Sequence, residues 1–428
     1  MNNYEFINKE FDDIVKTGPY NVPGLGAVLI KDGVPVFRYY GGWAVLGEKP
    51  KSFTGDSLFR IASLSKQFTV YAVMQLMEAG RLHLDDNVSD YLGFPLVHPA
   101  FPDRKITVRM LANHTSGLRD GIIYCIPPKF SVREFFSPQG KFYEGGAHFS
   151  LDSEPVGEYF CYCNLNYGLL GTIIEAITGE RFDRYIEKYI FKRLDIKGGY
   201  LPGNLSSEAF KNLGTLYQKK DYDGKWDEQL PWRGVMDDWH DSPPERDAVT
   251  MQNPYAVHDD TEIYDLSGYI PGNNATFFAP QGGLRVSLED MVHTLNMLMN
   301  QGCYKGNQFI SKACAEKMMK PQWIYNGHNG DTCDGTLLSY GLGLYQIKGN
   351  STARLSQNYD LNFVGHTGQA FGLYSGMFFI PGSKDGFVYI MNGIGISEDD
   401  PKSHGKFSSN FLWEEKVTDA LCNGLMNM

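Results

Sequence analysis

The pair Ser63 and Lys66 is the first feature of the sequence that could do chemistry. The two residues lie three positions apart at the start of a predicted helix, which places a hydroxyl and an amine one turn apart on one helix face. This arrangement suits a serine nucleophile with a lysine as its proton acceptor. A lysine is normally protonated, so the chemistry requires that burial or nearby cations lower the pKa of Lys66. The helix N-terminus would add partial positive charge and backbone donors close to the hydroxyl.

The Ser-x-x-Lys spacing is not specific by itself, because two common residue types meet at this spacing about once by chance in a chain of this length. Ser403 and Lys406 repeat it inside a loop segment that contains Pro and Gly, and we expect no catalytic role for them. Taken alone, Ser63 fits a helix cap followed by an exposed lysine better than it fits a nucleophile. Other segments of the chain must decide between the two interpretations.

Two further segments carry suitable side chains. Tyr162 and Asn164 place a phenol and an amide two positions apart, and a tyrosine near a cation can act as a general base or proton relay. Any single tyrosine among 26 is, however, more often part of a core. His366-Thr367-Gly368 is typical of a strand edge whose small residues let another backbone come close. Such an edge could pair with a peptide-like substrate and offer an N–H to an oxyanion, although His366 alone fits a hydrogen-bonded strand histidine.

The elements that must position these residues follow a clear order. Two strand-rich runs between residues 24 and 42 meet at Asp32-Gly33, a typical hairpin turn. Apolar periodicity predicts helices over 66–79, 173–190, 287–299 and 411–425, and strands over 372–380 and 386–393. Strands at both ends around a helical middle predict one α/β layer that joins the two ends of the chain, with a helical region inserted.

The charge of the chain is concentrated in one segment. The 428 residues carry a formal net charge of -11, and residues 221–265 hold thirteen acids against three bases. An acidic protein is poorly suited to bind the phosphate backbone of nucleic acids. We expect the segment to open with a hairpin at Asp223-Gly224 and to continue as a long surface loop. It could lie over a cleft and favour substrates with a free amine, or it could be a solvated loop that aids solubility.

The cysteines and the N-terminal residues bear on the compartment. Seven scattered cysteines without metal-type spacing indicate free thiols in a reducing environment. The first fifteen residues contain acids where a signal peptide would have a basic and then an apolar region. No apolar run approaches about 18 residues, the length typical of a membrane span. We therefore expect a cytoplasmic protein with no membrane partner and no nucleic-acid partner.

The ordered set of Ser63-x-x-Lys66, Tyr162-x-Asn164 and His366-Thr367-Gly368 resembles the three active-site boxes of the penicillin-binding protein and class C β-lactamase-like serine hydrolases. The flanking sequence agrees over five segments in the family's usual order, from about residue 20 to the C-terminus. These segments are PGLGAVLIKDG at 23, LFRIASLSKQFT at 58, ITVRMLANHTSGL at 106, YCNLNYGLLG at 162 and QGGLRVSLEDM at 281.

The resemblance implies a role for each matched residue. Ser63 would be the acylated nucleophile, Lys66 would take or relay its proton, and Tyr162 would be the partner base that protonates the leaving group. Asn164 would hold the substrate's acyl amide and orient Lys66. The remaining implied positions are His366, Thr367 and Gly368 as the third edge of the cleft, the backbone N–H groups of Ser63 and Gln369 as the oxyanion hole, and His114 as a structural landmark.

Two positions depart from the family pattern. His366 stands where β-lactamases and many carboxypeptidases carry a lysine that helps to hold a substrate carboxylate, and a neutral histidine weakens that kind of recognition. Cys163 occupies the middle of the Tyr-x-Asn box, where Ser or Ala is more common. We expect Cys163 to be a small buried residue that points away from the cleft, because its two neighbours face the cleft.

The resemblance implies an α/β, β-lactamase/transpeptidase-like fold in which an antiparallel sheet flanked by helices carries an inserted, mainly helical subdomain. We expect one two-lobed catalytic unit over 1–428, with an α/β lobe at 10–60 and 295–428 and a helical lobe at 61–294.

The implied activity is hydrolysis of a small amide, ester or short peptide through an acyl-enzyme, without metal or cofactor. A D-amino-acid peptidase or amidase is favoured; a carboxylesterase, a β-lactamase and a penicillin-binding sensor without turnover are the alternatives. The oligomeric state is left open.

Overall fold

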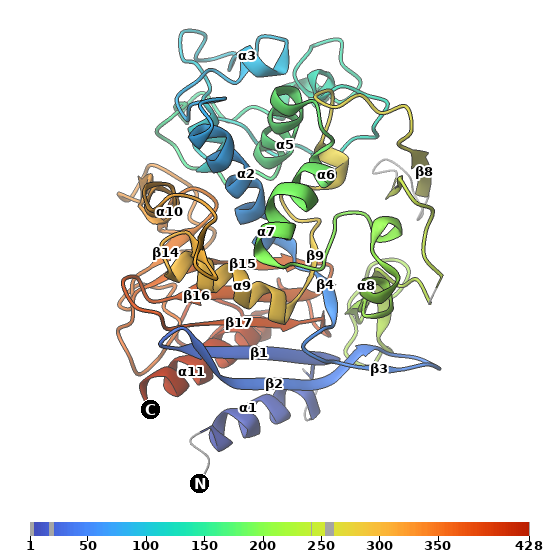
Figure 1. The fold of residues 1–428 in the computed structure, drawn as a ribbon, viewed down its shortest axis with the longest axis vertical. Coiled ribbons are helices and arrows are strands. Elements are labelled where there is room, and N and C mark those ends of the chain that lie inside the picture. Colours follow the sequence, from blue (N-terminus) through green and yellow to red (C-terminus); the bar gives the residue numbers. More distant parts are fainter. Residues whose placement is uncertain (1–3, 17–20, 241, 253–260, 428) are drawn as a thin grey trace.

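Strands from both ends of the chain form one antiparallel sheet of nine strands in the computed structural model, which describes residues 4–16, 21–240, 242–252 and 261–427 (Figure 1). The sheet order is β12-β13-β14-β15-β16-β17-β1-β2-β3. The strands are β1 (Gly24–Lys31), β2 (Val34–Val45), β3 (Lys51–Ser52), β12 (Trp323–Ile324), β13 (Ser339–Tyr340), β14 (Tyr345–Ile347), β15 (Phe363–Ala370), β16 (Leu373–Phe379) and β17 (Gly386–Met391). Since β1 pairs with β17, the predicted joining of the two ends is confirmed.

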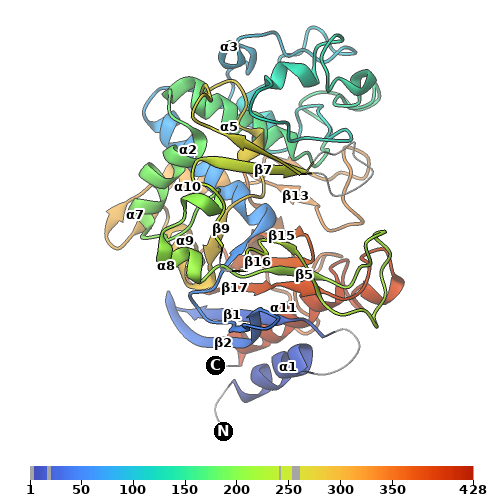
Figure 2. The same ribbon diagram turned by 90° about the vertical axis from the view of Figure 1, so that its right-hand side faces the viewer.

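Helices cover both faces of this sheet, as predicted (Figures 1 and 2). The helices α1 (Glu5–Lys16) and α11 (Leu412–Met426) lie on the face that Figure 1 shows below the sheet, and α9 (Leu288–Met299) lies on the other. Successive residues of a strand point to opposite faces, so β1 contributes to both layers of the core. Ala27 and Leu29 pack with α1 and α11, whereas Val28 and Ile30 belong to the cluster on the other side.

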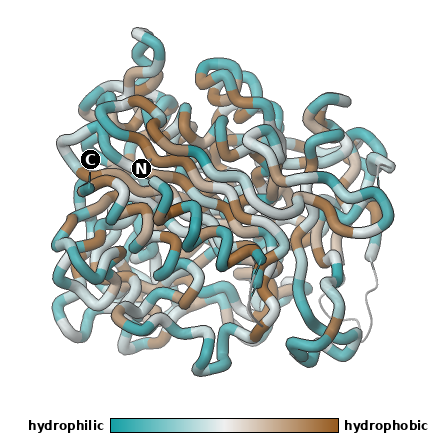
Figure 3. Tube along the Cα trace, turned by 90° about the horizontal axis from the view of Figure 1, so that it is seen from below, coloured by the Kyte–Doolittle hydropathy of each residue, from teal (hydrophilic) through white to brown (hydrophobic). Residues whose placement is uncertain are grey.

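The hydrophobic residues follow this layering. In Figure 3, which views the molecule from below, the brown stretches run along the strands and the teal stretches lie mainly in the outer loops and the exposed helix faces.

The predicted hairpin at Asp32-Gly33 is confirmed, and both turn residues have positive φ, 51° and 79°. Such a pair is typical of a two-residue hairpin turn whose twist matches the flanking strands.

The inserted region begins after β4 (Leu58–Arg60) with the 3₁₀ turn η1 (Ala62–Ser65) and the helix α2 (Lys66–Glu78). Its other helices are α3 (Ser89–Leu92), α4 (Val108–Ala112), α5 (Leu165–Thr178), α6 (Phe182–Ile186), α7 (Lys192–Leu194) and α8 (Ser207–Lys211), and β9 (Arg285–Ser287) returns to pair with β4. Lobe boundaries near residues 60 and 295 stay a prediction. None of the helices in the described ranges has the length and apolar character needed to cross a bilayer.

The prediction of one helix over 173–190 was wrong. The helix α5 starts earlier and ends at Gly179, whose φ of 72° places it in the left-handed region. Glycine adopts this conformation without steric cost and commonly ends helices. The chain re-enters helix at Phe182 and continues into a π-type turn over Glu187–Phe191. The apolar pattern continued across the break because both helices pack on the same core.

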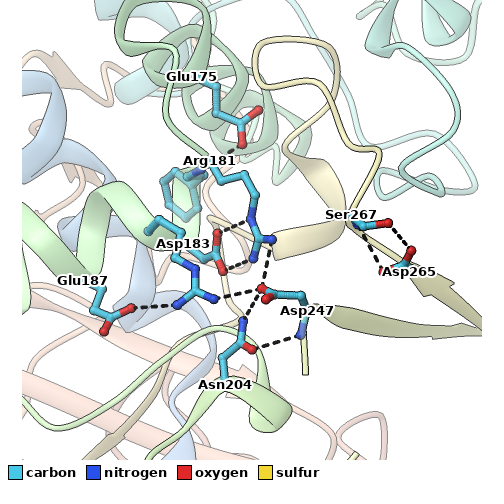
Figure 4. A network of polar contacts seen from close by, with 10 residues as sticks. Glu175, Arg181, Asp183, Glu187, Asn204, Asp247, Asp265 and Ser267 are labelled. Carbon is cyan, nitrogen blue, oxygen red and sulfur yellow. Dashed lines mark hydrogen bonds and ion pairs between the residues drawn. The ribbon is translucent and has the colours of Figure 1, made fainter. Parts of the chain in front are cut away.

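The acidic segment has more structure than the predicted surface loop. It contains β6 (Arg233–Met236), which pairs with β5 (Leu216–Gln218), and the hairpin of β7 (Ala248–Gln252) and β8 (Thr261–Asp265). The carboxylate of Asp247 forms an ion pair with Arg181 at 2.9 Å and accepts from Asn204 at 3.1 Å (Figure 4). It also accepts from Arg184 at 2.8 Å. Several acids of the segment therefore tie it to neighbouring helices and turns.

The most buried of these contacts joins Asp237 to Arg285 of β9. Both Oδ atoms of Asp237 accept from the guanidinium at 2.9 Å, and the two side chains are only 1% and 10% exposed. A bidentate pair of this kind is strong, and removal of one partner leaves the other charge buried without compensation.

We expect Asp237→Asn to lower the free energy of unfolding by about 3 to 5 kcal/mol, because Arg285 would stay buried without a counter-charge. Urea unfolding followed by circular dichroism measures the change. The neighbouring Asp238, whose carboxylate is 34% exposed, offers a matched control, and Asp238→Asn should have almost no effect. Equal destabilisation by both variants would contradict the importance of this pair.

Candidate active site

Ser63 and Lys66 meet at the junction of η1 and α2. The Nζ atom of Lys66 lies 3.0 Å from the Oγ atom of Ser63, and the lysine side chain is completely buried. This geometry excludes the alternative of a capping serine with an exposed lysine, since the side chain of Ser63 caps no helix. The residue before Ser63, Ala62, has a φ of 50°, a strained backbone conformation of the kind that clusters at functional sites.

Burial controls the protonation of Lys66. Loss of water around the amine lowers the pKa of Lys66 to about 7, even though the carboxylate of Asp120 acts in the opposite direction. Besides Ser63, the amine contacts Asn164 Oδ1 at 2.8 Å and the carbonyl oxygen of Gln281 at 3.2 Å. Both oxygens can only accept, so they can hold the two hydrogens of a neutral amine. The lone pair of the amine is then directed to the hydroxyl of Ser63.

Asp120 is a residue that the sequence analysis missed. Its carboxylate accepts from Asn164 Nδ2 at 2.9 Å and from the backbone N–H of Leu165 at 2.9 Å. Because a carboxylate accepts only, it forces the oxygen of the Asn164 amide to face Lys66. The only signal in the sequence was its place three residues after the His-Thr-Ser-Gly segment that ends at Gly117.

Tyr162 completes a chain of hydrogen bonds at Ser63. Its hydroxyl donates to Ser63 Oγ at 2.9 Å, and burial holds the pKa of Tyr162 well above its ordinary value, so the phenol keeps its proton. His114 stacks under the ring with centroids 4.4 Å apart, and its Nδ1 accepts from the N–H of Cys163 at 3.1 Å. These contacts give His114 a positioning role. Cys163 is fully buried, as expected.

The strand β15 brings the third predicted group to Ser63. A Cβ atom at Gly368 would lie 2.3 Å from the carbonyl oxygen of Ile61 and 3.3 Å from the backbone nitrogen of Ser63, so only glycine permits this approach. Ser375 of β16 donates to the same carbonyl oxygen at 3.0 Å. The backbone of β15 is thereby placed beside the N–H of Ser63, as an oxyanion hole formed with Gln369 requires.

One edge of β15 is open next to this contact. The neighbouring strand β14 pairs only with residues 363–365 of β15, so within the described part of the chain no strand pairs with residues 366–370 on that side. An unpaired strand edge can bind an extended, peptide-like molecule through its backbone groups.

His366 is neutral in this position. It is 2% exposed, and burial together with the charge of Lys66 lowers the pKa of His366 to about 3. Its Nδ1 contacts the carbonyl oxygen of Thr367, so Nδ1 carries the hydrogen, and Nε2 accepts from the hydroxyl of Tyr340 at 2.9 Å. Both ring nitrogens are therefore occupied. His366 does not supply the cation that a lysine would supply at this place.

These residues line a cleft of about 950 Å³. Ser63, Tyr162, Asn164, His366, Thr367 and Gln369 all contribute to its wall. The hypothesis that the acidic segment 221–265 overhangs the cleft is not supported, because none of the lining residues comes from its described part. The acids that do line the cleft are Asp334, Glu398, Asp399 and Glu414.

The second Ser-x-x-Lys sequence lies elsewhere in a different environment. Ser403 is buried in a short 3₁₀ turn, Pro401–Ser403, where its hydroxyl donates to the carbonyl oxygens of Glu398 and Asp400 at 2.9 and 2.8 Å. These contacts stabilise the turn, and the absence of a catalytic role for Ser403 stays a prediction.

Comparison with known proteins agrees with this geometry. A family model described as Beta-lactamase matches residues 11–404. The chain belongs to the β-lactamase family. Penicillin-binding protein 4* of Bacillus subtilis (strain 168) is a relative with 33% identity over 329 residues, which cover 74% of the chain and 58% of the relative. A putative D-alanyl-D-alanine carboxypeptidase of Escherichia coli (strain K12) is 31% identical over 191 residues, which cover 41% of the chain and 42% of the relative.

Solved structures share the fold of this β-lactamase family chain. The D-amino acid amidase from Ochrobactrum anthropi SV3 aligns over 100% of both chains with a TM-score of 0.64 and 20% identity. An octameric penicillin-binding protein homologue from Pyrococcus abyssi aligns over 92% of this chain and 73% of its own, with a TM-score of 0.61 and 22% identity. The predicted fold class is confirmed.

We expect the rate at which a fluorophosphonate labels Ser63 to rise with pH and to level off above about 7, because Lys66 accepts a proton only when it is neutral. In the Asp120→Asn variant the midpoint should move to lower pH by roughly one unit, since the carboxylate no longer stabilises the charged amine. Mass spectrometry of the labelled chain over a pH series measures both midpoints. A surface variant, Glu158→Gln, should keep the wild-type midpoint, and an unchanged midpoint in Asp120→Asn would contradict this electrostatic role.

Proposed function

We propose that this protein is a serine hydrolase that cleaves small amides, esters or short peptides through a covalent acyl-enzyme on Ser63. The observation that carries the proposal is the continuous set of contacts from the buried amine of Lys66 through Ser63 Oγ to the hydroxyl of Tyr162. The base with a lowered pKa, Lys66, and the protonated phenol of Tyr162 both lie within hydrogen-bond distance of the nucleophile. Membership of the β-lactamase family supports the same reaction class.

In the acylation step, Ser63 Oγ attacks the substrate carbonyl carbon while its proton passes to the neutral amine of Lys66. The oxyanion that forms would be held by the backbone N–H groups of Ser63 and Gln369. Collapse of the tetrahedral intermediate breaks the bond to the leaving group. Tyr162 gives its proton to the departing nitrogen or oxygen. The resulting phenolate then takes the proton that Lys66 received from Ser63, by direct transfer or through a water molecule, because Ser63 Oγ is now an ester oxygen and cannot relay a proton. Water then hydrolyses the ester on Ser63.

We propose D-amino-acid amides and peptides as the substrate class. The names of similar proteins support this choice: one aligned structure is called a D-amino acid amidase, and one relative a putative D-alanyl-D-alanine carboxypeptidase. The open edge of β15 supports a substrate with peptide-like backbone groups. The neutral state of His366 argues against a β-lactam, whose carboxylate is usually met by a cation at that place.

A cytoplasmic location remains part of the proposal. All seven cysteines are free thiols in the structure, although Cys161 and Cys333 both lie near the cleft region. Free thiols are typical of a reducing compartment. We propose small molecules or short peptides as the only class of partner.

Labelling by a fluorophosphonate should disappear in Ser63→Ala and persist in Ser403→Ala. Of these two serines, Ser63 has the amine of Lys66 beside its hydroxyl, whereas the hydroxyl of Ser403 donates to backbone carbonyl oxygens. Mass spectrometry of the intact chain measures the stoichiometry, and Ser403→Ala is the matched control with the same spacing to a lysine. Full labelling of Ser63→Ala would show that the nucleophile is another residue.

For the substrate class, we expect D-alanine 4-nitroanilide to be hydrolysed at least about tenfold faster than the L-enantiomer. The edge of β15 fixes the direction of the acyl backbone, so the side chain of the wrong enantiomer would point into the wall. Release of 4-nitroaniline by the wild type and by Ser63→Ala measures the difference. Sustained turnover of 4-nitrophenyl butyrate without any anilide cleavage would identify a carboxylesterase, and one burst without turnover would identify a binding module.

A further inference from the structure

The guanidinium of Arg60 is a cation in the cleft for which the described residues supply no acidic partner. Arg60 is the last residue of β4 and lines the same cleft as Ser63. Its Nη1 atom is buried and makes no hydrogen bond. Within the described ranges, Arg60 takes part in no ion pair, and its charged group instead lies 4.7 Å from the centre of the Phe371 ring. The residue as a whole is partly buried, and a buried guanidinium nitrogen without a hydrogen-bonding partner is unfavourable, so a ligand that accepts from Nη1 would stabilise this position.

Asp237, an acid whose charge acts on Arg60, is already paired with another arginine. Arg285 stands opposite Arg60 across the pairing of β4 and β9, and it holds both oxygens of Asp237. Loss of water around the group, together with the positive charge of Arg285, lowers the pKa of Arg60 to about 10, which leaves the guanidinium protonated at neutral pH. No ion pair within the described residues joins Arg60 to Glu398 or Asp399, two of the acids that line the same cleft.

Arg60 lies on the side of the cleft where the acyl part of an extended substrate would bind. Tyr162, which would protonate the leaving group, lies beside His366 near the start of the open edge of β15, with ring centroids 6.2 Å apart. Phe371, which contacts Arg60, directly follows the last residue of β15 at the other end. A substrate extended along β15 would therefore place its leaving group near His366 and its acyl part near Arg60. Arg60 lies three positions before Ser63, so their Cα atoms are at most about 11 Å apart.

We propose that Arg60 is a specificity-determining residue that binds a carboxylate on the acyl part of the substrate, so that acidic acyl residues are preferred. The inference rests on the proposed acyl transfer to Ser63. The planar guanidinium can donate two parallel hydrogen bonds to a carboxylate, and it would gain the partner that the fold does not provide. Stacking on Phe371 would hold the group ready for this contact.

The test compares two isosteric substrates, the 4-nitrophenyl esters of N-acetyl-D-glutamate and N-acetyl-D-glutamine, both linked through the α-carboxyl group. Their side chains differ in charge but hardly in size, and acetylation removes the free amine. We expect the wild type to have a kcat/KM at least about tenfold higher for the glutamate ester, after subtraction of the uncatalysed rate. Arg60→Gln should lose roughly 10- to 100-fold on the glutamate ester and less than about threefold on the glutamine ester.

Two further variants sharpen the result. Arg60→Lys keeps the charge but not the fork of donors, so the preference should be intermediate. Arg104→Gln removes a half-exposed arginine that pairs with Glu158 outside the cleft, and it should leave the preference unchanged. Fluorophosphonate labelling of Ser63 in each variant verifies that the site is folded.

The outcomes separate this inference from the proposed function. Equal rates for the two esters in the wild type, or an equal loss on both esters in a labelled Arg60→Gln variant, would overturn the role of Arg60 and leave the acyl-enzyme intact. Wild-type turnover by Ser63→Ala would instead overturn the proposed function.

Discussion

The burial of the Lys66 amine is the interaction on which the rest of the site depends. An exposed lysine is protonated at neutral pH and cannot accept a proton from serine. Here removal of the amine from water lowers the pKa of Lys66 to about 7. An amide oxygen, a carbonyl oxygen and the hydroxyl of Ser63 hold the amine in place. Ser63 lies three positions before Lys66, whereas Asn164 and Gln281 come from distant parts of the chain.

The fold is arranged to make that burial possible. The carbonyl group of Gln281 reaches Lys66 because the N–H of Leu284 donates to Ser65, and the N–H of Ile61 donates to the carbonyl oxygen of Leu284. On the opposite side, the absence of a side chain at Gly368 lets the sheet approach Ser63. The sheet and the inserted region thus enclose the nucleophile from two directions.

The distribution of charge separates structural from functional groups. The acidic segment accounts for much of the net charge, yet its most buried carboxylate, Asp237, serves to neutralise Arg285. In the cleft itself, the usual cation position holds a neutral His366, while Arg60 is charged and unpaired within the described residues. The local density of acids and bases along the sequence therefore does not indicate which charged groups line the cleft.

The sequence by itself determined what depends on local geometry. The spacing of Ser63 and Lys66, the hairpin turn at Asp32-Gly33 and the placement of strands at both ends of the chain around a helical middle follow from backbone periodicity and steric preference, and these predictions were confirmed. Only the tertiary structure decided the contact of Asp120 with Asn164, the isolation of Arg60 and the protonation of Lys66 and His366. Desolvation and charge pairing depend on segments up to several hundred residues apart, and no local pattern encodes which of them will meet.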